Sequence, residues 1–453
     1  MHLEDGFDPL QGVTLSFAAQ RLAIPTGRIG SLERVVSTRG GLVSSVIPLA
    51  TGTERAEYRV CQALLGDVGS TADVTLAEGL GHGSLDGAGT GSDLAAAADL
   101  AVVEAVERWS STVVTVDQLT VSAAQDQESG LDMTTVPTCS PAEFAHPSCP
   151  LVPFDPTVPL RWVTGLDLTT GSPVSVPAVM TYLGMRQWSS SERWWLPIST
   201  GCAAHTDLSL ALLAGLFEVV ERDALTLTWL HQLPLPELEL DLPSLSVARD
   251  RANASGAGRT RLFDATLDTG VPTVYAVNES SGPVATVVGC ATAADASTAV
   301  RKVLREVQSC RIAIEAAGPG GDDPDTFLSA IDGARWMGDP RRAGAFSFLD
   351  RSPRRLVSEM PPLSAASADA LLPTALQAVR DVGGRPVAVD LTTREARRAG
   401  LHVVRVIVPE LQPMTFSPRA RYLAHPRVAR GAFAAGYQPK PAHQLNALPQ
   451  PMA

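Results

Sequence analysis

Residues 199–225, STGCAAHTDLSLALLAGLFEVVERDAL, join a loop of small residues directly to a helix-forming run. The run carries Glu218, Glu221 and Arg222 in the pattern E-x-x-E-R, and this spacing places the three side chains on one helical face. Valine, leucine and alanine fill most of the other positions. The stretch therefore predicts a packed helix that presents an acidic face with one arginine.

The same order of features occurs earlier in the chain. A glycine-rich passage over residues 77–93 leads into the helix-forming run 94–111, which carries Glu104, Glu107 and Arg108 in the same E-x-x-E-R pattern. One copy of this pattern is most simply explained by exposed ion pairs. Two copies, each in a helix that its apolar residues would bury, favour a functional interpretation because buried charges need partners.

A third unit follows the strand-like runs TVYAVNES and VATVVGCATA. Neighbouring carboxylates raise one another's pKa unless a cation compensates, and all-oxygen clusters suit magnesium, so the two E-x-x-E-R helices could hold magnesium between them. The third helix, expected over residues 296–317, offers a mixed set that suits phosphate oxygens and magnesium ligation: Lys302, Arg305, Glu306, Gln308 and Arg311.

Other sequence motifs for nucleotide binding or catalysis are missing. The chain has no G-x-x-x-x-G-K-[ST] pattern, and GAGTGSD at residues 87–93 lacks the lysine, so a nucleotide bound here would not use a P-loop. No H-E-x-x-H helix or G-x-S-x-G turn is present. His82 and His205 are the only histidines beside the candidate site, and each is better explained as a loop or packing residue than as a general base.

Composition restricts the class of protein. The formal net charge of -12 over 453 residues argues against sequence-independent nucleic-acid binding, which needs clustered cations. The acidic N-terminal stretch is unlike a secretory signal, and no uncharged apolar run approaches the roughly 18 to 20 residues that span a bilayer. Six scattered cysteines indicate no disulfide framework. We expect a cytoplasmic protein with no nucleic-acid or membrane partner.

The order of segments predicts an α+β protein in which mixed β-sheets carry packed helices in repeated loop–helix units. Residues 1–40 are a lead-in, residues 41–430 form the body, and residues 431–453 are a proline-containing tail. Within the body we expect an irregular proline-rich loop over about 136–159 and a long surface excursion over about 317–365.

Three blocks of this sequence resemble the YcaO family. Residues 199–225 are similar to its most recognisable block, and VGCATAADASTAVRKVLREVQSCR at 288–311 is similar to its third motif. Residues 390–414, together with RYLAHPR at 421–427, resemble its C-terminal block. Members of this family bind Mg-ATP without a P-loop, through paired E-x-x-E-R helices and a later helix with Glu and Gln. The resemblance implies a YcaO-like fold over most of the chain.

The resemblance also assigns roles to the candidate residues. Members that form azolines often end in a proline-rich tail near the active site, and LPQPMA is similar. The implied catalytic residues are Pro451 and Ala453, the implied ATP-binding residues are Arg108, Arg222, Lys302, Glu306 and Gln308, and the implied magnesium ligands are Glu104, Glu107, Glu218 and Glu221. The departures from the family pattern are Leu100 for serine, Ala203 for a polar residue, Leu210 for an acidic residue, and Gln308, which stands before the usual place of the glutamine at Ser309 or Cys310.

By this resemblance the chain would be an ATP-dependent cyclodehydratase. A Cys, Ser or Thr side chain of a precursor peptide would add to the preceding carbonyl, and the oxygen would leave as phosphate to give a thiazoline or oxazoline. A separate partner protein would deliver the peptide, and a homodimer is compatible with the sequence. The alternatives are thioamide or amidine formation with the same ATP activation, or a non-catalytic YcaO-like scaffold. The four departures from the family pattern favour the scaffold.

Overall fold

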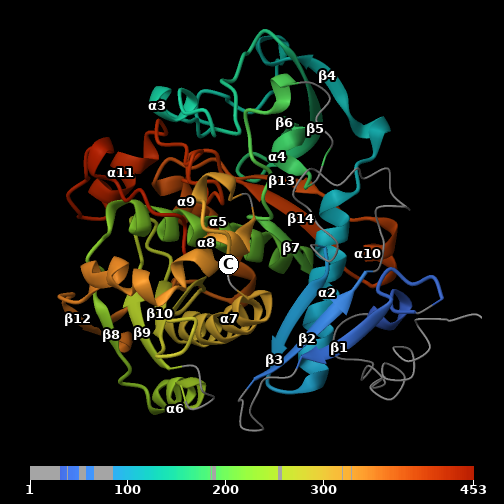
Figure 1. Ribbon diagram of the computed structural model, residues 1–453. Coiled ribbons are helices and arrows are strands. Elements are labelled where there is room, and N and C mark those ends of the chain that lie inside the picture. Colours follow the sequence, from blue (N-terminus) through green and yellow to red (C-terminus); the bar gives the residue numbers. More distant parts are fainter. Residues whose placement is uncertain are drawn as a thin grey trace, which may run out of the picture.

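The computed structural model describes residues 31–37, 39–49, 58–65, 85–183, 185, 190–253, 258–318, 320–327 and 329–452 (Figure 1). Most of the N-terminal lead-in lies outside these residues, as do His82 and the tail residue Ala453.

Three β-sheets form the body (Figure 1). The first is antiparallel in the order β1–β2–β3, with β1 Ser45–Leu49, β2 Arg59–Leu64 and β3 Gly87–Gly91. The second is antiparallel in the order β4–β5–β13–β14–β7, with β6 also paired to β5; its strands are β4 Thr120–Ala123, β5 Pro159–Asp167, β6 Pro173–Pro177, β7 Cys202–His205, β13 Val387–Asp390 and β14 His402–Ile407. The third has the order β11–β10–β9–β8–β12 and is antiparallel except where β12 joins β8; its strands are β8 Glu237–Glu239, β9 Arg259–Asp264, β10 Thr273–Glu279, β11 Thr286–Thr292 and β12 Arg354–Leu356.

The repeated units expected from the sequence are present, one for each sheet. The last strand of each unit lies at an end of its sheet's hydrogen-bonded order and is followed at once by a long helix: β3 by α2 (Leu94–Thr112), β7 by α5 (Leu208–His231) and β11 by α7 (Ala296–Ala317). An aspartate caps each helix, since Asp93, Asp207 and Asp295 accept the backbone N–H three residues ahead.

Residues 87–91 of the glycine-rich passage form strand β3, where the sequence suggested a loop. A Cβ atom at Gly89 would lie 2.0 Å from the Ala97 carbonyl oxygen on α2. Glycine here lets the helix backbone pack directly on the strand. Small residues in this passage therefore serve close packing, which turn statistics do not reveal.

Shorter helices complete the fold. The segment 317–365, expected as a surface excursion, contains α8, a 3₁₀ stretch over Pro340–Leu349 and β12, and it buries Met337, Phe346 and Leu349 in the core. The proline-rich loop contains only one helical turn, α3. The remaining helices are α3 Pro141–Phe144, α4 Ala178–Thr181, α6 Pro243–Ala252, α8 Ala330–Met337, α9 Leu371–Asp381, α10 Arg394–Arg398 and α11 Arg427–Ala434.

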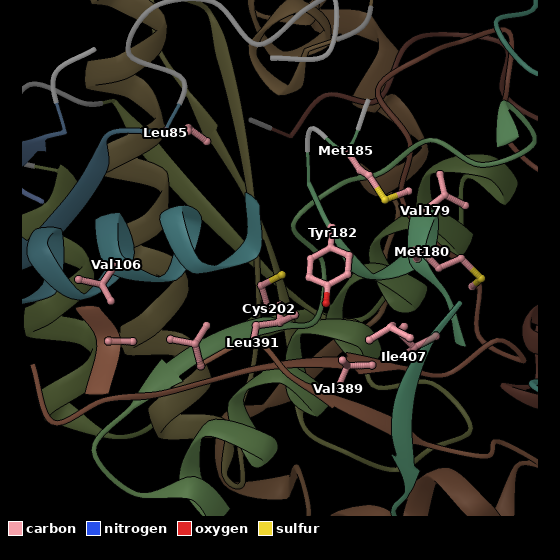
Figure 2. Packing of buried hydrophobic residues seen from close by; sticks show 14 of the residues in the cluster. Leu85, Val106, Val179, Met180, Tyr182, Met185, Cys202, Val389, Leu391 and Ile407 are labelled. Carbon is pink, nitrogen blue, oxygen red and sulfur yellow. The ribbon is translucent and has the colours of Figure 1, made fainter. Parts of the chain in front are cut away.

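The largest apolar cluster lies behind the second sheet. Figure 2 shows Tyr182, Cys202, Val389 and Leu391 gathered in it, and all four are buried. The cluster joins α2 to the inner strands β13 and β14 through Val106 and its neighbours. Burial of this apolar surface fixes α2 against the sheet that carries β7.

Within the described ranges, none of the helices combines the length and the apolar character that crossing a bilayer requires.

A buried ionic network holds the C-terminal part of the body against α5. The Arg427 guanidinium contacts Asp223 and Asp268, in each case with an N–O distance of 2.6 Å, and the three side chains are at most 10% exposed. Asp223 also accepts the backbone N–H of Gln412 at 2.7 Å. Because Asp223 directly follows Arg222, this network fixes the middle of α5, which carries the E-x-x-E-R motif.

Arg427→Ala should lower the free energy of unfolding by about 3–5 kcal/mol, because it leaves two buried carboxylates without their cation. Chemical denaturation of the purified variant measures this. Arg354→Ala is the matched control, because Arg354 pairs with Glu239 at the surface, and it should hardly move the denaturation midpoint. Equal midpoints for the two variants would show that the buried network does not anchor α5.

Candidate functional site

On α2, each glutamate of the E-x-x-E-R motif is hydrogen-bonded to a strand. Glu104 accepts the N–H of Ala88 on β3 at 2.9 Å, and its other oxygen lies 2.6 Å from Arg108. Glu107 accepts the N–H of Ala204 on β7 at 3.1 Å. The first glutamate is thus oriented by the strand of its own unit and the second by the strand of the next unit.

On α5 the same rule holds. Glu218 accepts the N–H of Gly201, just before β7, at 3.1 Å. Glu221 accepts the N–H of Thr292 on β11, in the third unit, at 2.9 Å. One guanidinium nitrogen of Arg222 lies 3.6 Å from each of these two carboxylates.

On α7, Glu306 accepts the N–H of Cys290 on β11 at 3.2 Å, and Lys302 donates to the carbonyl oxygen of Thr292 at 2.9 Å. The second and third units therefore meet at β11, where carboxylates from α5 and α7 bind alternate residues of one strand, and the first unit meets the second at β7 through Glu107. Strands β3, β7 and β11 lie at the ends of their sheets, and their outward N–H groups need acceptors.

Five carboxylates of this site, Glu104, Glu107, Glu218, Glu221 and Glu306, meet three cations, Arg108, Arg222 and Lys302. The excess of negative charge appears in the pKa values. Burial, then the nearby Glu218 and Glu104, raises the pKa of Glu107 well above its usual range. Burial, then Glu221, raises the pKa of Glu306 to about 8.

The pKa of Arg222 is raised above its usual value, because the pull of Glu221, Glu218 and Glu306 outweighs the effect of burial. Burial likewise raises the pKa of Glu221 in spite of the neighbouring Arg222 and Lys302. Such buried like charges are costly in the isolated protein, and the cost falls when further positive charge binds.

The donor chemistry fits magnesium bound together with phosphate. All the candidate ligands are carboxylates, and one oxygen of each is already held by a backbone N–H. Within the part of the chain that the structure describes, no three His, Cys, Asp or Glu side chains converge closely enough to enclose a metal by themselves. Mg²⁺ commonly takes one or two carboxylates and completes its octahedron with water and phosphate oxygens, and this cluster is suited to that arrangement.

Gln308 lies apart from the carboxylates. Its amide is buried and donates to the carbonyl oxygen of Ala252 on α6 at 3.1 Å. Cys310, one helical turn after Glu306, is on the face of α7 that points to the site. Burial, followed by the nearby Glu306, raises the pKa of its thiol. Arg222 and Glu104 are also near enough to affect this pKa. Cys310 follows Glu306 by four residues, and this spacing is the signal in the sequence that places both side chains on one face of the helix.

The other departures lie around the site. Leu100 and Leu210 are 39% and 43% exposed, one and two helical turns before Glu104 and Glu218. Ala203 is buried in β7. His205 accepts the N–H of Asp207 at 2.9 Å, which is a loop role.

The C-terminal tail reaches the site. Met452 is fully buried, forms a β-bridge with Val288 on β11 and has its sulfur 2.7 Å from a guanidinium nitrogen of Arg222. Pro451, which directly precedes it, is also buried. Figure 1 marks the C-terminus near the centre of the molecule, beside α7 and α8. The tail therefore lies beside a predicted nucleotide-binding residue.

Fold and site together define a protein of three strand–helix units around a carboxylate cluster, without a P-loop. The family model of the YcaO cyclodehydratases, described as ATP- and Mg²⁺-binding, matches residues 88–412, and the chain belongs to the YcaO family. This confirms the resemblance seen in the sequence, the predicted fold class, and ATP and Mg²⁺ as the cofactors.

Known proteins extend this similarity. An uncharacterised protein of Methanothermobacter thermautotrophicus is 29% identical over 338 residues, 73% of this chain and 82% of that protein. A heterocyclase in complex with substrate and cofactor shares the fold with a TM-score of 0.76 at 18% identity, over 93% of this chain and 56% of that one. The YcaO protein of Methanopyrus kandleri bound with AMPPCP and Mg²⁺ has a TM-score of 0.59 at 21% identity, over 81% and 85%. The chain thus spans just over half the length of that heterocyclase.

Glu306→Gln should have two opposite effects. In metal-free protein at neutral pH it should raise the free energy of unfolding by roughly 1–3 kcal/mol, because the raised pKa makes Glu306 take up a proton on folding, and each pKa unit corresponds to about 1.4 kcal/mol. Saturating Mg-ATP should then stabilise the variant much less than the wild type. Thermal and chemical unfolding with EDTA or with Mg-ATP measures both effects.

Glu128→Gln is the control, because Glu128 is exposed on a loop of the second sheet, and it should leave both quantities unchanged. A Glu306→Gln variant that is less stable without metal and equally stabilised by Mg-ATP would remove Glu306 from the site.

Proposed function

We propose that this protein is an ATP-dependent cyclodehydratase that converts Cys, Ser or Thr residues of a ribosomally made precursor peptide into thiazoline or oxazoline rings. The observation that carries the proposal is the meeting of the carboxylate cluster, Arg222 and the C-terminal tail at one place. Membership of a family of cyclodehydratases supports the same reaction.

The proposed roles follow from the contacts. Glu107, Glu218 and Glu221 would bind magnesium with the oxygens that face away from their backbone N–H donors, and Glu104 would bind it with the oxygen that also contacts Arg108. Bound Mg-ATP would supply the phosphoryl group that activates an amide oxygen of the peptide and leaves with it as phosphate. The chain has mainly to position the reactants and to balance their charge, which needs no nucleophilic side chain.

Arg222 is the proposed phosphate contact. Carboxylates hold one end of its guanidinium, while the other end meets the sulfurs of Met452 and Met414 at 2.7 and 3.8 Å. Thioether sulfur is a weak acceptor, so a phosphate oxygen would be a much stronger partner for this nitrogen. Arg108, Lys302 and Glu306 would complete the surroundings of the nucleotide.

The placement of the tail supports azoline formation over the thioamide or amidine alternatives. With Met452 at Arg222, Pro451 is suited to act on the peptide beside the nucleotide. Ala453 lies outside the described residues, and its proposed catalytic role rests on the resemblance to the family. We further propose that the enzyme works in the cytoplasm on a precursor peptide delivered by a separate partner protein, alone or as a homodimer. The heterocyclase of the same fold was solved with substrate and cofactor.

The scaffold alternative is less well supported. All four glutamates of the two E-x-x-E-R motifs are present, and each is held by its own strand N–H. A protein that had lost ATP turnover would have no cofactor to balance this excess of partly buried negative charge, which is costly by itself. Their presence in an otherwise packed interior favours retained nucleotide chemistry.

Replacing Glu218 and Glu221 by alanine should lower ATP-dependent ring formation at least about 100-fold and abolish saturable Mg-ATP binding, because the ligands that position the nucleotide are lost. Mass spectrometry of the peptide follows the loss of one water per ring, and calorimetry follows binding. Exchange of oxygen for sulfur in the product would instead identify thioamide formation.

Glu128→Ala serves as the control for both measurements. Circular dichroism of the double variant checks that the fold is intact. Unchanged turnover in the double variant would exclude these glutamates from the mechanism, and no Mg-ATP binding by the wild type, even with a partner protein present, would favour the scaffold.

Deleting residues 449–453 should lower ring formation about 100-fold while Mg-ATP affinity stays within a few-fold, because the tail positions groups near the peptide and the carboxylates remain. The same two assays measure this. Full turnover by the shortened chain would show that the tail has no role in catalysis.

A further inference from the structure

The outward edge of β11 makes three contacts at alternate residues. Thr292 donates its N–H to Glu221, Cys290 donates to Glu306, and Val288 pairs with Met452 of the tail. Alternate residues of a strand are about 7 Å apart. The tail therefore occupies the next position on the edge that orients two of the site carboxylates.

A second contact ties the tail to α5. The indole N–H of Trp229 donates to the carbonyl oxygen of Leu448 at 3.1 Å. Trp229 follows Arg222 by seven residues, which is two turns on the same side of the helix. One helix thus carries both the proposed phosphate contact and a support for the tail.

A third contact joins the tail to α8. A Cβ atom at Gly333 on α8 would lie 2.2 Å from the carbonyl oxygen of Gln450, and the three atoms nearest to it all belong to Gln450. Glycine within a helix costs about 1 kcal/mol relative to alanine. The backbone of the tail therefore rests on α8 at a place where any side chain would displace it, and the glycine has a reason to be there.

We infer that Gly333 is a positioning residue that seats the Gln450 backbone and so sets the register in which Met452 reaches Arg222. The seating follows from the contacts alone. Its effect on turnover rests on the proposed function, since it requires that the tail takes part in ring formation.

The test is Gly333→Ala, with Gly344→Ala as the matched control, because a Cβ atom at Gly344 would meet no atom within 4 Å. Brief oxidation by hydrogen peroxide followed by mass spectrometry reports the exposure of each methionine. Met452 should oxidise at least about 10-fold faster in Gly333→Ala than in the wild type, because it is fully buried when the tail is seated. Met337, which is 1% exposed on the same α8, should stay protected.

Continued protection of Met452 in Gly333→Ala would overturn the inference. If Met337 also becomes exposed in Gly333→Ala, the same substitution is made in the chain that lacks residues 449–453. Without Gln450 the added methyl group meets no obstacle, so Met337 should be protected there. Greater exposure of Met337 in the shortened variant than in the shortened chain that keeps Gly333 would mean that α8 itself needs the glycine, and would overturn the inference.

Turnover separates this inference from the proposed function. Gly333→Ala should lower ring formation about 10-fold or more at unchanged Mg-ATP affinity, and it should add nothing to the loss in the shortened chain, because both changes remove the same interaction. Additive losses would contradict a role through the tail. If Gly333→Ala exposes Met452 but keeps full turnover, the tail has no catalytic role. The inference that Gly333 positions the tail would still hold.

Discussion

The hydrogen bonds from outward strand N–H groups to helix carboxylates are the interaction on which this site depends. Each E-x-x-E motif joins two units, because its first glutamate is bound in or just before the strand of its own unit and its second is bound by the strand of the next. A spacing of three residues along the helix is enough to let the two carboxylates reach from one strand to the other. The duplicated spacing thus has a structural cause as well as a chemical one.

This arrangement explains how acidic groups are kept in a packed interior. A carboxylate that accepts a backbone N–H regains part of the solvation it lost on burial, and the nearby arginines balance part of the charge. The remaining excess of negative charge is a standing cost, visible in the raised pKa of Glu107 and Glu306. Such a cost is reasonable in a site whose cofactor brings the missing positive charge.

The sequence predicted the long helices, the strand that precedes α7 and the gathering of the E-x-x-E-R residues, because helical spacing and hydrophobic periodicity are local properties. It did not predict that residues 87–91 form a strand, since glycine is chosen there for contact with α2 and not for a turn. The direction of Gln308 depends on α6, which packs against the other side of α7. The contact of Met452 with Arg222 joins residues 230 positions apart and leaves no local pattern.

The ends of β-sheets are also where separate protein molecules can join by forming new backbone hydrogen bonds. In this protein the outward N–H groups of β3, β7 and β11 that face the site are taken by glutamates, and the tail covers the next position on β11. The residues that prepare the site for its cofactor therefore also protect these edges from aggregation. The same carboxylates thus serve twice, as candidate cofactor ligands and as acceptors for strand edges that would otherwise be open to pairing with another molecule.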